Sequence, residues 1–433
     1  MSMAAWFAVS DAMLTNLTPD VALAERLFDE LRAATHDGVG ITREAYGPGE
    51  RRAHAIVRAA AEDIGLECRV DPIGNLLMTL PGANRVAPRL VLGSHLDSVA
   101  EGGNFDGAAG VLAGLAAVAG MRRAGFVPGR DVTVVAIRAE EAGSWFPVSY
   151  PGSRGALGLL RPEELQVKRQ DSGRTLAEHM REEGFAPEFV EAGGKTFSKE
   201  DTAAFLELHI EQGPVLDTEG VPIGIVTGIP GSRRLRAARV IGEYNHSGAT
   251  PRKYRRDAAI ALAELAHRVD DRWVALEATG HTLVCTFCVL ATTAEAGFTK
   301  IAGEARFQLD VRSVNARSVD ALMETLYEAI PEIEARRGVR FELSVETGSR
   351  AAPMDATIQA GLARAADQLG VKHLSMASGA GHDAAAFAMA GIPSAMLFVR
   401  NQHGSHNPKE DMRMEDFSNA CAVVQRWAAE TAQ

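Results

Sequence analysis

Apolar residues recur at intervals of three and four along Val21–Ala34 and Arg51–Ile64. This spacing predicts two amphipathic helices at the start of the chain. Further on, short runs of aliphatic and β-branched residues are bounded by Gly, Pro and polar residues. They predict largely buried strands at Leu76–Leu80, Arg89–Gly93 and Val132–Arg138.

An apolar, Ala-rich segment, Gly107–Ala124, lies between the last two of these strands and predicts a packed helix. Strand, helix and strand in this order predict a parallel sheet. The C-terminal part returns to the same pattern, with helices predicted at Ala356–Leu369 and Ala384–Ala390 and a buried strand at Ser394–Phe398. We therefore expect the α/β class, with a mainly parallel sheet flanked by helices.

The order of predicted strands and helices changes beyond about Gly228. Here the pattern predicts three strands and two helices: strands Arg234–Ile241, Thr282–Ala291 and Ala305–Val311, and helices Asp257–Val269 and Val319–Ile330. These elements are enough for a small α/β sandwich. We expect one large domain, residues 1–227 and 348–433, interrupted by a smaller inserted domain, residues 228–347.

Composition narrows the class of protein. The chain of 433 residues, with 46% hydrophobic and 23% charged residues, is typical of a soluble globular protein with two domains. The net charge of −11 repels nucleic acid, so nucleic-acid binding is not expected. The apolar stretch Val111–Met121 is about half of the ~20 residues that a membrane-spanning helix needs, so no membrane partner is expected.

The N-terminal segment and the cysteines bear on location. Met1–Leu17 lacks a basic leader, and Asp11 interrupts it before an export-type apolar run can form. The four cysteines are too few and scattered for a disulfide framework. Cys285 and Cys288 form a CxxC, but within a predicted strand they point to opposite faces, which disfavours chelation. A cytoplasmic protein is expected.

Candidate metal ligands first appear where a predicted strand ends. His95 lies in the segment GSHLDS, and Asp106 ends the Gly-rich turn GGNFD before the Ala-rich helix. Parallel sheets place ligands at strand ends and helix openings. Asp97, two residues after His95, can orient its imidazole. His95 and Asp106 are therefore a candidate metal-binding pair.

The strand Val132–Arg138 is followed by two adjacent carboxylates, Glu140 and Glu141. Neighbouring like charges are unfavourable unless a cation or a proton compensates them. One Glu can bind a metal while its neighbour serves as a general base. An isolated Glu-Glu pair is more often a solvated strand end, so this pair carries weight only together with other ligands.

Two more histidines complete a candidate set. His209 lies at the end of an alternating strand, in ELHIEQGP, and His406 lies in the polar segment GSHNPKE. A single His is more often a structural residue than a ligand. His95, Asp106, Glu141, His209 and His406 together form a nitrogen and oxygen set that suits zinc or another late first-row divalent ion. Five ligands suit two ions that share one carboxylate.

The other motifs in the chain give little indication of catalytic chemistry. His382 and Asp383, in SGAGHD, are interpreted as structural neighbours of the site. The chain contains no GxxxxGK[ST], HExxH or GxSxG pattern, so phosphate transfer and serine-hydrolase chemistry have no support.

Four segments in this order, GSHLDSV with GGNFDG, EEAGSWF, ELHIEQGP and GSHNPKE, resemble the N-carbamoyl-L-amino acid amidohydrolases. Allantoate amidohydrolase and beta-ureidopropionase belong to the same branch of the dinuclear-zinc aminoacylase and carboxypeptidase family. The resemblance runs from about Gly38 to Glu410. It implies a hydrolase that cleaves the carbamoyl or a related amide C–N bond of an N-substituted amino acid or a similar small carboxylate.

The resemblance also implies a role for each metal-site residue. Asp106 would bridge two divalent ions per subunit, His95 and His209 would hold one, and Glu141 and His406 the other. Zinc is expected, with manganese, cobalt or nickel as alternatives. Glu140 would be the general base for attack by a metal-bridging hydroxide.

The inserted domain resembles the family's lid and dimerisation domain. Its segment YNHSGATP matches a loop whose His, here His246, reaches the partner subunit's site to stabilise the oxyanion, which implies a homodimer. Arg234 and Arg312 match positions that hold the substrate carboxylate, for which a guanidinium fork is well shaped. Gln212, beside a ligand, is expected to contact substrate.

Two departures from the family pattern concern the substrate. Thr299 stands where an oxyanion-side Asn is usual, and Trp145 stands where the family typically has Arg. A more apolar or aromatic substrate pocket is one consequence. The nearest alternative function is an aminoacylase or exopeptidase that uses the same metals on acyl-amino acids or dipeptides. The segment ELHIEQGP favours the carbamoylase branch.

Overall fold

The computed structural model describes Leu14 and residues 16–433. The segment Met1–Leu17, considered above for a leader, lies almost wholly outside the described residues. The described chain forms two compact units: one runs up to Thr227 and resumes at Met354–Gln433, and the other is Gly228–Pro353. Residues 348–353, expected in the large domain, belong to the smaller unit because strand β14 (Glu346–Ser349) pairs with β8 (Gly231–Ile241) there.

The larger unit is built on an eight-stranded sheet in the order β1-β2-β4-β3-β5-β17-β6-β16. Its strands are β1 Glu67–Val70, β2 Leu76–Leu80, β3 Arg89–His95, β4 Val132–Ile137, β5 Thr202–Ile210, β6 Ile223–Val226, β16 His373–Met376 and β17 Ser394–Val399. The pairs β4-β3, β3-β5, β5-β17 and β6-β16 are parallel. The pairs β1-β2, β2-β4 and β17-β6 are antiparallel. The predicted α/β class with a mainly parallel sheet is confirmed.

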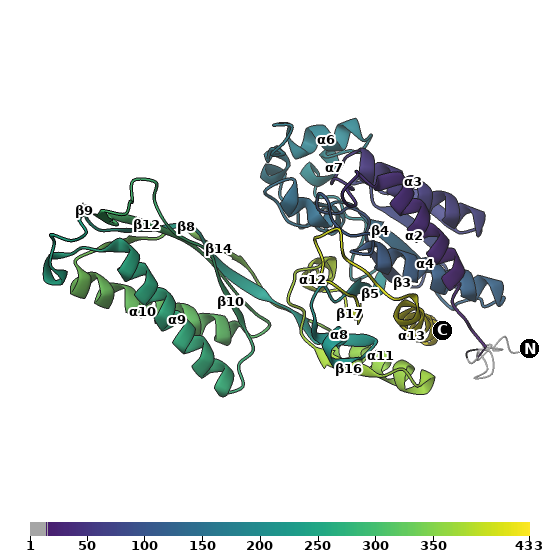
Figure 1. Cartoon of the computed structure of the whole chain (residues 1–433). Coiled ribbons are helices and arrows are strands. Elements are labelled where there is room, and N and C mark those ends of the chain that lie inside the picture. The colour runs from purple at the N-terminus through teal and green to yellow at the C-terminus, as the bar shows by residue number, and fades with distance from the viewer. Residues whose placement is uncertain (1–13, 15) are drawn as a thin grey trace, which may run out of the picture. The chain divides into compact units, whose positions relative to one another are not determined.

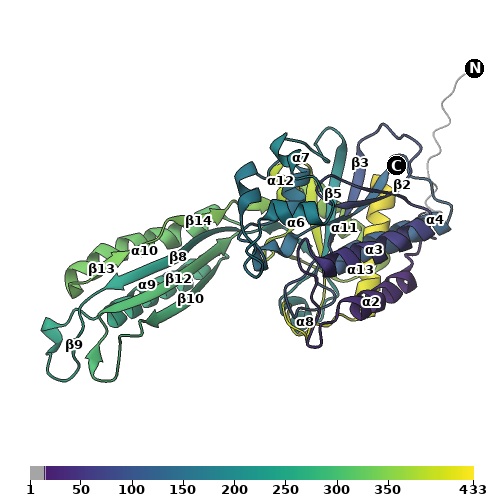
Figure 2. The same cartoon turned by 90° about the horizontal axis from the view of Figure 1, so that it is seen from above.

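Helices cover this sheet on both faces. They are α2 Val21–Thr35, α3 Pro48–Asp63, α4 Ala108–Arg123, α5 Pro151–Ala156, α6 Leu176–Glu182, α7 Glu188–Glu191, α8 Val215–Glu219, α11 Ala356–Leu369, α12 Asp383–Met389 and α13 Met414–Thr431. Helix α4 packs against β3 and β5 and against the C-terminal helix α13, which is yellow in Figure 1. Figure 2 shows α2, α3 and α13 on one side of the sheet and α12 on the other.

The sequence of α4 explains how closely this helix approaches the sheet. Every residue from Ala108 to Met121 is buried. A Cβ on Gly110 would lie 2.1 Å from the carbonyl oxygen of Leu208, so only glycine fits at that contact. The strand β4 is buried on both faces as well. Small residues in α4 and β-branched residues in β4 therefore place the strand ends and the start of α4 close together.

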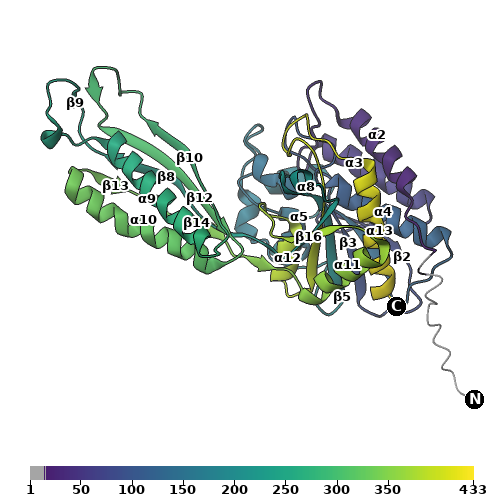
Figure 3. The same ribbon diagram turned by 60° about the horizontal axis from the view of Figure 1, so that its bottom comes forward.

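The smaller unit is an antiparallel sheet with two helices. Its strands are β8, β10 Val284–Thr292, β12 Glu304–Ser313, β13 Arg340–Glu342 and β14, with the short pair β9 Asn245–His246 and β11 Lys300–Ile301, and a further short strand β7 Gly228–Ile229 pairs with β15 Ala352–Pro353. Helices α9 (Ala258–Ala278) and α10 (Ala316–Arg337) pack against each other and against the sheet (Figure 3). The prediction of three strands is wrong, because β13 and β14 also pair with β8.

Both helices of this unit are longer than predicted. Helix α9 continues beyond Val269 because Leu276 still packs into the core. Helix α10 passes through Pro331 to Arg337, and Ile333 beyond the proline is fully buried. The burial of apolar side chains thus outweighs the hydrogen bond that the proline removes.

No helix among the described residues is long and apolar enough to cross a membrane.

Candidate metal centre and catalytic site

The predicted metal-binding side chains meet at one edge of the large sheet. His95 ends β3, and His209 lies near the end of the parallel neighbour β5. Asp106 immediately precedes the turn into α4, and Glu141 lies in the 3₁₀ segment that follows β4. His406 follows β17 in a loop. Carboxyl ends of parallel strands share an edge, and this topology brings distant residues together.

His95, Asp106 and His209 form the first cluster. Its members lie close enough for one cation: Asp106 Oδ1 is 3.5 Å from His95 Nε2 and 3.3 Å from His209 Nε2. The two Nε2 atoms are 3.3 Å apart. All three residues are buried.

Both imidazoles of this cluster present an acceptor atom to its centre. His95 Nδ1 lies 3.1 Å from the carbonyl oxygen of Asp97, and His209 Nδ1 lies 2.9 Å from that of Ile210. A carbonyl only accepts, so each Nδ1 carries the proton and each Nε2 of the neutral rings keeps its lone pair. Asp106 Oδ1 is buried and has no hydrogen-bond partner. Three lone pairs directed at one point fit a divalent cation.

Asp106, Glu141 and His406 form the second cluster. His406 Nε2 lies 2.7 Å from Glu141 Oε1 and 3.6 Å from Asp106 Oδ2. The hydrogen bond with Glu141 raises the pKa of His406 to about 9. These three side chains lie close enough together to hold a second cation.

The Asp106 carboxylate is shared by the two clusters, and other side chains orient it. Its Oδ2 accepts hydrogen bonds from Ser405 Oγ at 2.5 Å and from Gln212 Nε2 at 2.8 Å. Glu410 Oε1 accepts the backbone N–H groups of Phe105 and Asp106 at 2.8 and 3.1 Å. Sequence reasoning did not single out Ser405 and Glu410, although both belong to the segment GSHNPKE that it used.

Glu140 lies next to the first cluster. Its Oε2 is 3.9 Å from His95 Nε2, and only 7% of the residue is exposed. Burial, together with the neighbouring Glu141 and Asp97 carboxylates, raises the pKa of the Glu140 carboxyl well above its usual range. The buried carboxyl group is therefore a candidate proton carrier beside the first cluster.

One carboxylate aligns both members of the Glu pair. Asp97 Oδ1 accepts the backbone N–H of Glu140 at 3.0 Å, and Asp97 Oδ2 accepts that of Glu141 at 2.9 Å. Asp97 Oδ1 also lies 3.3 Å from His95 Nδ1. The expectation that Asp97 orients His95 described only one of its three contacts.

The neighbouring residues His382 and Trp145 lie against the site. The His382 ring packs 4.6 Å from the His209 ring, consistent with a structural neighbour. Trp145 Nε1 donates to the carbonyl of Ser98 at 2.9 Å, and its ring lies 4.7 Å from the Arg169 guanidinium carbon. Trp145 is therefore fixed beside the strand end that carries His95.

The smaller unit contains the remaining predicted site residues, in two groups. Arg234 Nε and Arg312 Nη2 both donate to Asp310 Oδ2, at 3.0 and 2.9 Å. His246 and Thr299 lie on the facing short segments around β9 and β11, where Ser247 N donates to the carbonyl of Thr299 at 2.9 Å.

Known proteins resemble the chain over nearly its full length. The model of Peptidase family M20/M25/M40 matches residues 91–430. An N-carbamoyl-L-amino-acid amidohydrolase of Paenarthrobacter aurescens is 34% identical, over 95% of this chain and 98% of the relative. An allantoate amidohydrolase of Bacillus subtilis is 33% identical, over 87% and 89%.

Solved structures agree with this similarity. A hydantoinase/carbamoylase family amidase from Burkholderia ambifaria has a TM-score of 0.85 and 32% identity, over 97% of this chain and 98% of that one. The resemblance inferred from the four sequence segments is confirmed. The chain belongs to Peptidase family M20/M25/M40.

Proposed function

We propose that the protein is a metal-dependent amidohydrolase that cleaves the carbamoyl (ureido) or a related amide C–N bond of an N-substituted amino acid or a similar small carboxylate. The observation that carries the proposal is the pair of clusters that share Asp106. The names of the relatives, amidohydrolases of N-carbamoyl-L-amino acids and of allantoate, support the substrate class.

In this proposal the site holds two divalent ions. His95 and His209 would hold one and Glu141 and His406 the other, and Asp106, which belongs to both clusters, would contribute to both. The mixed nitrogen and oxygen ligands suit zinc, with manganese, cobalt or nickel as alternatives. When bound, such ions polarise the substrate carbonyl and lower the pKa of water toward neutrality.

Glu140 is the proposed general base and acid. Its carboxyl group lies beside His95, and its backbone is fixed by Asp97. It takes a proton from the attacking water and later gives a proton to the leaving nitrogen. Its buried carboxyl group, 3.9 Å from His95 Nε2, is placed to carry this proton within the site. Cleavage of a carbamoyl group then gives an amine, carbon dioxide and ammonia.

Residues of the larger and smaller units have separate proposed roles in binding the substrate. Arg234 and Arg312 both donate to Asp310, and two guanidinium groups in this arrangement can also donate hydrogen bonds to a carboxylate of the substrate. Gln212, whose backbone has a φ of 65°, is proposed to contact the substrate beside Asp106. Thr299 is the hydroxyl donor proposed on the oxyanion side.

A homodimer is part of the proposal, with His246 acting in the partner subunit's site. The edge strand β10 supports it, because only β12 pairs with it among the described strands and it exposes apolar side chains. Val284 and Leu290 are 48% and 51% exposed. An exposed apolar edge favours pairing with a second copy. A cytoplasmic location is also proposed, which four free cysteines support.

The proposal is tested by supplying the protein with zinc, manganese, cobalt or nickel and measuring hydrolysis of a substrate panel. The panel contains N-carbamoyl amino acids, allantoate, acyl-amino acids and dipeptides. Ammonia release from a ureido substrate is expected. Cleavage of acyl-amino acids or dipeptides without any ureido substrate would favour the aminoacylase or exopeptidase alternative.

A further inference from the structure

His246 lies in a loop that fixes which ring nitrogen carries the proton. His246 Nδ1 accepts hydrogen bonds from the backbone N–H groups of Gly248 at 3.1 Å and Ala249 at 3.0 Å. Backbone N–H groups only donate, so Nδ1 must be the unprotonated nitrogen when both bonds are formed. In the neutral imidazole the hydrogen then lies on Nε2, which becomes a hydrogen-bond donor.

Other bonds within the loop hold the same geometry. Asn245 Oδ1 accepts the backbone N–H of His246 at 2.9 Å and the hydroxyl of Thr250 at 3.0 Å. The strands β9 and β11 add a short ladder in which His246 is opposite Lys300. A hydrogen bond thus links Asn245 at the start of the loop to Thr250 at its end.

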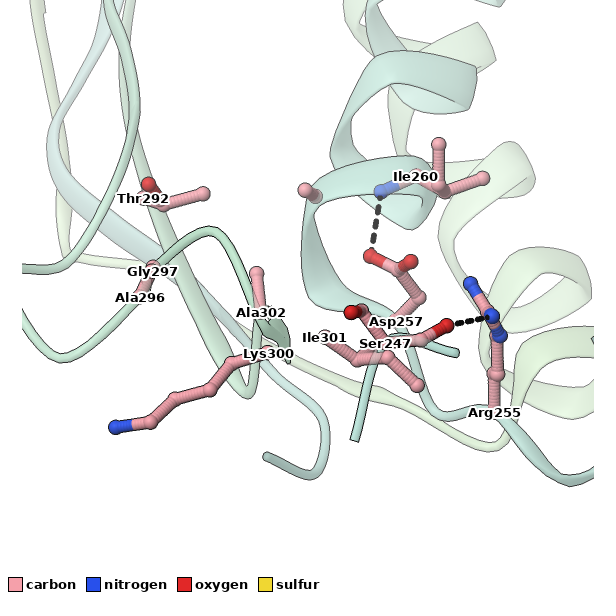
Figure 4. Close-up of a pocket in the computed structure, with 11 residues that line it drawn as sticks. Ser247, Arg255, Asp257, Ile260, Thr292, Ala296, Gly297, Lys300, Ile301 and Ala302 are labelled. Atoms are coloured by element: carbon pink, nitrogen blue, oxygen red, sulfur yellow. Dashed lines mark hydrogen bonds between the residues drawn. The ribbon is translucent and has the colours of Figure 1, made fainter. Parts of the chain in front are cut away.

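Arg255 holds this loop from outside. Its Nε donates to the carbonyl of Thr250 at 2.8 Å, and its Nη2 donates to the carbonyl of Ser247 at 2.5 Å. Figure 4 shows the bond between Arg255 and Ser247 at the wall of a cavity of about 450 Å³, which Lys300 and Asp257 also line. Where the loop faces the cavity it is not closely packed, and there the hydrogen bonds from Arg255 hold it in place.

We infer that Arg255 is a positioning residue, whose hydrogen bonds hold residues 247–250 so that His246 presents an Nε2–H donor. His246 then acts on the oxyanion by donating a hydrogen bond and not by accepting a proton. This inference rests on the proposed function, which assigns His246 to the oxyanion. A donor that is fixed before the reaction needs no reorganisation as charge develops. A planar guanidinium can reach two carbonyls at once, which a lysine ammonium does less well.

The ring nitrogens of His246 can be observed directly. The full chain, labelled with ¹⁵N-histidine, is examined by long-range ¹H–¹⁵N correlation spectra, and the signals of His246 are assigned with the His246→Gln variant. We expect an unprotonated Nδ1 and a protonated Nε2 in the neutral ring. In Arg255→Ala the spectrum should change to a mixture of both tautomers.

Arg256→Ala is the matched control. Arg256 is the next residue and is also an arginine, but its side chain is exposed and lies 3.9 Å from Glu243. The control should keep the parent spectrum and the parent turnover. Metal content and melting temperature, measured for all variants, distinguish a local change from loss of folding.

Kinetics provide the second measurement. Arg255→Ala should lower kcat by roughly 100-fold, because small displacements of a catalytic donor have effects of that size, while KM changes little. Arg255→Lys should lie between the parent and Arg255→Ala. A protonated Nδ1 in the parent, or equal behaviour of Arg255→Ala and Arg256→Ala, would overturn the inference.

The orientation of His246 by Arg255 can be tested separately from the catalytic role of His246 and from the proposed function. If Arg255 controls the tautomer but His246→Gln keeps full turnover, the catalytic role of His246 is wrong, although the loop still fixes the ring. If no substrate of the panel is hydrolysed, the proposed function fails, and the spectra still decide whether Arg255 orients His246.

Discussion

His95 Nε2 and His209 Nε2 lie 3.3 Å apart while the opposite nitrogen of each ring points to a carbonyl oxygen. Two neutral imidazoles that face each other in this way direct two lone pairs at the same point. Such an arrangement is unfavourable unless a proton or a cation lies between the rings. Asp106 Oδ1, buried and without a partner, adds a third lone pair.

Replacing Glu140 by Gln should abolish most turnover without emptying the metal site. Gln has the same shape but cannot take up a proton, and loss of a general base typically costs about 100-fold to 10,000-fold in rate. Turnover and metal content are measured on the same preparation. Glu141→Gln is the matched control, because it should lose bound metal. Full activity of Glu140→Gln would remove the assigned base.

Replacing Asp97 by Asn should weaken metal binding, although Asp97 itself is not a proposed ligand. The Asn amide must direct an N–H group at one of the backbone N–H groups of Glu140 and Glu141, which Asp97 accepts in the parent. Loss of an orienting partner typically lowers metal affinity by about 10-fold to 100-fold. Competition with a chelator of known affinity measures the change. Parental affinity in the variant would show that the three contacts of Asp97 are dispensable.

The metal-free protein should have a pH-dependent stability that comes from His406. Its pKa, raised from 6.5 to about 9 by Glu141, is higher in the folded than in the unfolded chain. Such a group stabilises the fold fully below pH 6.5 and loses this contribution as the pH rises through about 9. His406→Ala should therefore have a lower melting temperature than the parent near pH 6.5. This difference in melting temperature should disappear above about pH 9.

Melting temperatures of the two chelator-treated proteins across this range provide the measurement. His267→Ala, which removes an exposed imidazole, is the control and should show no such gap. A gap between parent and His406→Ala that stays constant with pH would contradict the prediction.

The action of His246 across the dimer can be tested by mixing two inactive variants. Glu140→Gln lacks the base, and His246→Ala lacks the donor. In a mixed dimer one site combines an intact Glu140 with the partner's intact His246. After subunit exchange, random pairing should restore roughly a quarter of the parental activity. No recovery, although mixed dimers form, would mean that His246 does not act in the partner's site.

Several features of the fold could be predicted from the sequence because burial leaves a strong pattern. The strand Leu76–Leu80 and the helix Ala356–Leu369 begin and end where the pattern places them. The helix α13 was not predicted, although Phe417, Val424 and Trp427 are buried, because polar residues are interspersed among them. The short strands β6 and β16 were missed as well, since four residues are too few to establish a period.

In the candidate site, the set of ligands could be predicted from the sequence but their orienting contacts could not. The side chains of His95, Asp106, Glu141, His209 and His406 could be proposed as a set because they follow strand ends or belong to distinctive segments. The contacts that orient them could not be predicted. Bonds from Asp97 to two backbone N–H groups, and from Glu410 to two others, depend on tertiary geometry. A sequence pattern does not record which backbone group a carboxylate reaches.

Metal content per chain tests the central claim most directly. The chain is stripped with a chelator, incubated with zinc, freed of excess metal and analysed by elemental mass spectrometry. Two ions per chain are expected in the parent, with markedly less zinc in His209→Ala and in Asp106→Ala, which would lose a ligand of one or both ions. A parent chain that retains no zinc, or variants that retain as much as the parent, would contradict the account.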